Sequence, residues 1–118
     1  MLPEDVREIV TDLLEKARSD QVAWSDGSLM APTISRNAVA VNLPGATLLF
    51  FMSQTGSAHF RMLNDQGQTV LTVGVKSDDI DHEMLLEIID RGRRKVLRAD
   101  ETISSVRKLL KKQGPVGT

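Results

Sequence analysis

The chain has 118 residues, of which 41% are hydrophobic and 26% charged, and its formal net charge is −1. A disordered chain would hold fewer aliphatic residues and more net charge. A membrane-spanning helix needs roughly 20 consecutive apolar residues, and the longest apolar run here is residues 48–52. The absence of cysteine excludes disulfides, thiol catalysis and cysteine-bound metal sites.

These features also predict where the protein works and what its core contains. Glu4 and Asp5 stand where a secretory signal would carry basic residues, and no long apolar segment follows them. Together with the lack of cysteine, this favours a cytoplasmic protein with no membrane partner. Aromatic residues make up only 3%, so the core must consist of Leu, Val, Ile and Met.

Residues 3–18 predict an amphipathic helix. Pro3 suits the first helical turn, and Glu4 and Asp5 lie near the positive end of the helix dipole. The apolar residues recur at the spacing of one buried stripe, and they are Val6, Ile9, Val10, Leu13, Leu14 and Ala17.

Residues 21–75 change to short strands separated by turns. Asp26-Gly27 lies between residues 22–25 and 28–30, which predicts a tight hairpin because both turn positions favour a positive φ. Later strands are expected at residues 37–43, 47–52, 58–63 and 68–75, joined by turns at 44–45, 54–57 and 64–67. The short connections imply antiparallel neighbours, and residues 47–52 are apolar enough to lie centrally.

Residues 78–113 return to helical spacing. Ser77, Asp78 or Asp79 can cap the start, and Gly92 is expected to bend or end the helix. Asp100 begins a second apolar series, so the segment is either one helix broken near residue 99 or two helices. The expected apolar positions are Met84, Leu85, Ile88, Ile89 and Val96, then Ile103, Val106, Leu109 and Leu110.

The element order predicts the α+β class. An N-terminal helix, an antiparallel β-meander of five or six strands, and one broken or two C-terminal helices should pack against one another, because the helices carry the apolar stripes that the sheet needs. We expect a single domain over residues 1–112 and a flexible tail at residues 113–118, which holds Gly and Pro.

Three segments hold residue types that can carry chemistry. Residues 78–83 combine acids with His82, as a divalent metal site would, but acids at a helix start also serve as caps. His59 lies on a strand without a framed nucleophile, and residues 53–57 lack the lysine of a phosphate-binding loop. We therefore expect no catalytic residue, no metal and no cofactor, and hence no enzyme.

The charges are strongly segregated along the chain. Residues 91–118 hold nine basic and two acidic residues, a net charge of +7, whereas residues 1–90 carry −8. A basic segment of this kind suggests a surface for a partner. The candidate partner-binding residues are Arg91, Arg93, Arg94, Lys95, Arg98, Arg107, Lys108 and Lys111.

Three interpretations of this basic segment compete. Its apolar stripe and charges favour a non-enzymatic interaction or regulatory domain that forms a homodimer or binds an acidic protein. Alternatively, Arg91, Arg93, Arg94, Lys95 and Arg98 neutralise the phosphates of a nucleic acid. The third interpretation is a solvated face whose basic residues complement a helix dipole. We take protein association as the leading hypothesis and nucleic-acid binding as the alternative.

Overall fold

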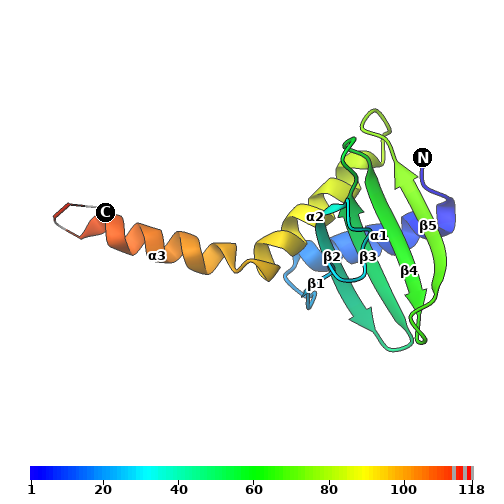
Figure 1. The fold of residues 1–118 in the computed structure, drawn as a ribbon, viewed down its shortest axis with the longest axis horizontal. Helices are drawn as coiled ribbons and strands as arrows, with labels where there is room; N and C mark the ends of the chain where they lie inside the picture. The colour runs from blue at the N-terminus through cyan, green and yellow to red at the C-terminus, as the bar shows by residue number, and fades with distance from the viewer. Residues whose placement is uncertain (113, 116, 118) are drawn as a thin grey trace.

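The fold is α+β, as the sequence predicts (Figure 1). The computed structural model describes residues 1–112, 114, 115 and 117. The flexible tail expected at 113–118 therefore falls partly, at 113, 116 and 118, outside the described residues. In chain order the elements are α1 (Glu4–Arg18), β1 (Ser25–Asp26), β2 (Arg36–Leu43), β3 (Ala46–Met52), β4 (Ala58–Asn64), β5 (Thr69–Val75), α2 (His82–Val96) and α3 (Ala99–Lys111).

The five strands form one sheet in the order of the chain, and every neighbouring pair is antiparallel. The longer strands match their expected positions to within one residue. In the register, Phe50 of β3 lies between Val39 of β2 and Phe60 of β4, so strand alternation places these three side chains on one face. The rings of Phe50 and Phe60 stack with their centroids 5.0 Å apart.

Helices α1 and α2 cover this face of the sheet (Figure 1). Of the stripe expected on α1, only Ile9 is exposed, at 37%, because it lies at the edge of the buried face. The helical residues that enter the core are Val6, Val10, Leu13 and Leu14 of α1 and Leu85, Ile88 and Ile89 of α2.

The opposite face of the sheet holds a second, smaller apolar cluster. Leu49 and Phe51 of β3 are buried there beside Ala38 and Ala40 of β2, and Ala31 from the β1–β2 connection packs against them. Strand β3 is thus buried on both faces, as its nearly continuous apolar sequence predicts.

The hairpin expected at Asp26-Gly27 is wrong. Ser25 and Asp26 pair with β2, opposite Ala40 and Val39, and Gly27 donates a hydrogen bond to the Ala38 carbonyl at 3.1 Å. Pairing with the long strand β2 outweighs pairing with residues 28–30, which form a turn instead. Position 27 needs glycine because its backbone lies close to the Leu49 side chain, and a Cβ there would be 2.6 Å from that side chain.

Gly92 does not end the helix, which was one of the two outcomes expected for it. Helix α2 passes through it to Val96. A Cβ at this position would lie 2.7 Å from the Trp24 ring and 3.0 Å from the side chain of Val39. The break comes instead at Arg98, whose φ of 55° puts it in the left-handed region, so the segment forms two helices.

Helices α2 and α3 differ in their surroundings. The expected packing against the sheet holds for α2, which lies across the strands. Helix α3 adjoins α2, none of its 13 residues is buried, and it extends away from the rest of the domain (Figure 1).

Gly92→Ala provides a test with an unusual sign. In an exposed helix this change stabilises by about 1 kcal/mol, because glycine is the weaker helix former. Here we expect a net loss of about 1–3 kcal/mol, because the new methyl group must displace the Trp24 ring. Thermal unfolding followed by circular dichroism measures it, with Ser104→Ala on exposed α3 as the control. A higher Tm for Gly92→Ala would contradict the close packing.

Candidate interaction surface

Two basic residues of α2 are held by acids from distant parts of the chain. Arg93 lies 3.7 Å from the carboxylate of Asp26 and donates a hydrogen bond to the Ala38 carbonyl at 3.3 Å. Lys95 forms an ion pair with Asp20 at 2.9 Å, and this hydrogen bond raises the pKa of Lys95. Lys95 therefore joins α2 to the segment that follows α1, and Arg93 joins it to β1 and β2.

Two further basic residues are paired across the junction between α2 and α3. Arg94 contacts Asp100 at 2.8 Å, and Arg98 contacts Glu101 at 2.6 Å. The acids that open α3 thus neutralise Arg94 of α2 and Arg98 of the junction. This arrangement uses up the acidic charge of α3 and leaves its C-terminal half basic.

Glu87 is the centre of a three-residue charge cluster on the outside of α1 and α2. Arg18 donates two hydrogen bonds to it, at 2.7 and 2.8 Å, and Arg91 donates one at 2.8 Å. These hydrogen bonds, Arg18 first, lower the pKa of Glu87 to about 2. Arg91 is therefore committed to an internal contact, like its neighbours on α2.

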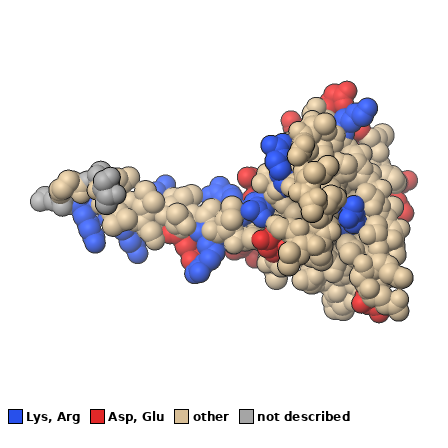
Figure 2. Space-filling model, in the orientation of Figure 1, with Lys and Arg blue, Asp and Glu red and all other residues tan. Residues whose placement is uncertain are grey.

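The expected set of partner-binding residues thus divides in two. The five residues from Arg91 to Arg98 all have acidic partners within the chain. The basic residues on the last two turns of α3, Arg107, Lys108 and Lys111, have no ion-pair partner in the described part of the chain. The same holds for Lys112, which directly follows α3 and was not in the set expected from the sequence. Figure 2 shows this basic charge along the projecting helix.

The same helix exposes an apolar stripe. Ile103, Val106, Leu109 and Leu110 are between 44% and 62% exposed, although their spacing is that of a buried helix face. We call these four residues the α3 stripe. An apolar stripe beside basic side chains, on a helix without a buried residue, is the strongest unexplained feature of the molecule.

Helix α1 carries the opposite charge. Glu4, Glu8, Asp12 and Glu15 recur every three or four residues and so share one exposed face, which we call the α1 acidic stripe. None of the four has an ion-pair partner among the described residues. A groove of about 480 Å³ runs along its N-terminal half, lined by Met1, Leu2, Glu4, Arg7, Glu8, Thr11 and Asp12. The sequence shows the acidic excess of residues 1–90, but it does not show that four of these acids share one face of α1.

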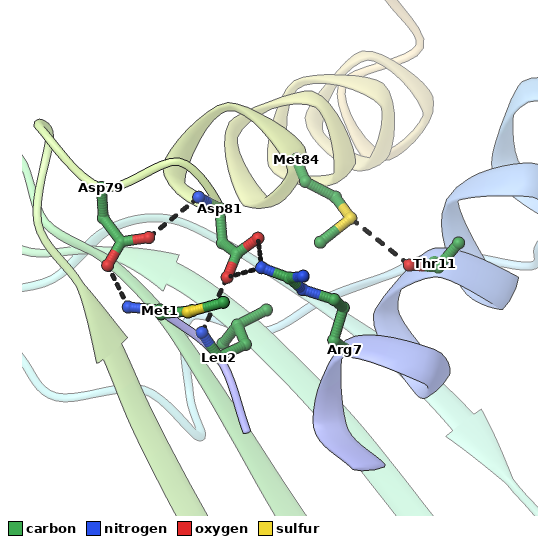
Figure 3. A network of polar contacts seen from close by, with 7 residues as sticks. All are labelled: Met1, Leu2, Arg7, Thr11, Asp79, Asp81 and Met84. Carbon is green, nitrogen blue, oxygen red and sulfur yellow. Dashed lines mark hydrogen bonds and ion pairs between the residues drawn. The ribbon is translucent and has the colours of Figure 1, made fainter. Parts of the chain in front are cut away.

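The acids expected as metal ligands or helix caps fasten the N-terminus instead (Figure 3). Asp81 is buried and accepts hydrogen bonds from the Leu2 backbone N–H at 2.7 Å and from Arg7 at 2.7 and 2.8 Å. Burial alone would raise the pKa of Asp81, but these hydrogen bonds and the Arg7 charge lower it. Asp79 pairs with the N-terminal amino group of Met1. Within the described residues, no three His, Asp or Glu side chains are grouped to hold a metal.

The two histidines also have structural neighbours. His82 lies with Nε2 2.8 Å from the Gly56 carbonyl, which ties the turn at 53–57 to the start of α2. His59 stacks on Phe51 with ring centroids 5.1 Å apart, beside Arg61. Burial, together with the Arg61 charge, lowers the pKa of His59. In the turn, the N–H groups of Gly56 and Ser57 are bonded to Ser53, so neither is available to an anion.

Comparison with known proteins adds no relative. No protein-family model, no curated protein and no solved structure matches this chain. Among the described residues, no helix has both the length and the apolar character needed to cross a bilayer. The unpaired charges and the exposed apolar residues described above are the features of the molecule that point to a function.

The Glu87 cluster predicts a pH-dependent stability. The pKa of Glu87 lies below its ordinary value of 4.5 in the folded chain, so the cluster stabilises the fold fully above that value. Its contribution is lost as the pH falls toward 2. Glu87→Gln should therefore lower Tm by a few degrees at pH 7, with a difference from the parent that shrinks between about pH 5 and pH 2. The exposed control Asp65→Asn should show no such trend, and a Glu87→Gln difference independent of pH would contradict the assignment.

Proposed function

We propose that the chain is a non-enzymatic interaction domain of regulatory type, which associates with a second protein molecule through α3 and forms a homodimer. The observation that carries the proposal is a 13-residue amphipathic helix that projects from the domain with none of its residues buried. We propose that the protein acts in the cytoplasm, and the absence of cysteine is compatible with that location.

The energetics of α3 support a docking role. Isolated helices of fewer than about 12–15 residues are marginal in water, because nucleation is costly and packing supplies most helical stability. Helix α3 has its ion pairs with Arg94 and Arg98 at its start, and its α3 stripe lies in water. Burying four aliphatic side chains against a partner would remove this exposed apolar surface and stabilise the helix.

Nucleic-acid binding is the second candidate. It is favoured by Arg107, Lys108, Lys111 and Lys112, which have no ion-pair partner in the described part of the chain. It is disfavoured because the five basic residues between positions 91 and 98 that were expected to bind phosphates each have an acidic partner within the chain. Phosphate binding also gives no role to the α3 stripe, so protein association accounts for more of the surface.

The proposal predicts that polar substitutions on the α3 stripe abolish self-association. The double variant Val106→Glu/Leu110→Glu should sediment as a monomer at concentrations where the parent is a dimer, because carboxylates cannot be buried in an apolar contact without a large cost. Analytical ultracentrifugation measures both masses. Leu29→Glu, at a fully exposed loop position, is the matched control and should remain a dimer.

Two results would count against the proposal. A parent chain that stays monomeric at every concentration would remove the homodimer. Tight binding of mixed-sequence DNA or RNA in a fluorescence-anisotropy titration, collapsing with added salt and unaffected by Val106→Glu/Leu110→Glu, would favour the nucleic-acid candidate, since each neutralised phosphate releases counterions.

A further inference from the structure

We propose that the surface which receives α3 is the α1 acidic stripe and its groove on a second copy of this chain, and that the exchange is reciprocal. This inference rests on the proposed function, in that it takes α3 to be the element of self-association. It adds which surface of the second copy binds α3, and which charges make that surface complementary to α3.

Charge complementarity is the first support. The α1 acidic stripe has four acids, and the end of α3 has four basic residues when Lys112, directly after the helix, is included. Neither set has an ion-pair partner among the described residues. At about 1.5 Å per residue, α1 is about 22 Å long and α3 about 20 Å, so the two helices can lie alongside over most of their lengths. Opposite patches of this kind steer docking and fix its register.

The groove along α1 also suits the apolar side of α3. Met1 and Thr11 line it together with Glu4, Glu8 and Asp12, and Met1 is 76% exposed, whereas Leu2 is buried. Arg7 lines it too, but its guanidinium is paired with Asp81 of the same molecule. Ile9 on the neighbouring face of α1 is partly exposed as well. The acceptor therefore combines apolar side chains with a rim of carboxylates, and α3 combines an apolar stripe with a rim of ammonium and guanidinium groups.

The direction of α3 makes a second copy the occupant. The Lys95–Asp20 ion pair holds the end of α2 beside the end of α1, and α3 starts a few residues later. From there it extends away from the domain, whereas the groove lies at the opposite, N-terminal end of α1 (Figure 1). A helix that leaves one molecule and enters the same groove on the other gives a closed two-fold dimer, the commonest symmetric assembly.

Pairing of α3 with α3 has less electrostatic support. The acids at the start of α3, Asp100 and Glu101, are already bound by Arg94 and Arg98 of the same molecule. Two such helices would therefore share apolar contact but offer no unpaired acid to the basic residues. The α1 acidic stripe does offer one.

A charge-swap experiment tests the acceptor. One variant carries Glu8→Lys and Asp12→Lys on α1, and the other carries Lys108→Glu and Lys111→Glu on α3. In each variant alone, both copies of the contact become repulsive, so the dissociation constant should rise about tenfold or more. In an equimolar mixture both contacts are again between opposite charges, and a heterodimer should form. Sedimentation velocity with one variant labelled measures it.

The outcomes separate this inference from the proposed function. Asp65→Lys, an exposed acid on the β4–β5 turn, is the control and should leave the dimer unchanged. If Glu8→Lys/Asp12→Lys dimerises as tightly as the parent, the α1 acceptor is wrong, while self-association through α3 stands. If the parent itself is monomeric throughout, the proposed function fails first. Monomeric variants whose mixture also stays monomeric would overturn the reciprocal contact.

Discussion

The rest of this molecule depends on which helices cover the core face of the sheet. Helices α1 and α2 together cover that face, and they are held to each other by the buried carboxylate of Asp81, which binds Arg7 and the Leu2 backbone. The other face carries its own small cluster around Leu49 and Phe51. Helix α3, which begins after the left-handed residue Arg98, extends away from this face and buries none of its 13 residues.

Internal ion pairing then decides which charges are available to a partner. The basic residues of α2 are neutralised by Asp20, Asp26 and Glu87, and those at the junction by the first acids of α3. Two charged surfaces, the α1 acidic stripe and the last turns of α3, remain without ion pairs in the described residues. The proposed dimer joins these two surfaces and buries the α3 stripe between them.

The sequence predicts most of the elements, because alternation and helical spacing depend on neighbours in the chain. It misplaces the two glycines that serve contacts between distant segments: Gly27 admits Leu49, and Gly92 admits Trp24. Contacts between distant segments also decide which basic residues are paired within the chain and which are not. Lys95 and Asp20 are 75 positions apart, so their pairing cannot be seen in a count of local charge. The amphipathic character of α3 is visible in the sequence, but its projection from the domain is not.

The most direct test of the account is amide hydrogen exchange of residues 99–112 at several protein concentrations. A short helix without buried residues should exchange rapidly in the monomer, because local opening costs little free energy. The account predicts that protection of α3 rises with concentration, together with protection along α1. Exchange of α3 that is independent of concentration would contradict the claim that this helix docks on a second copy.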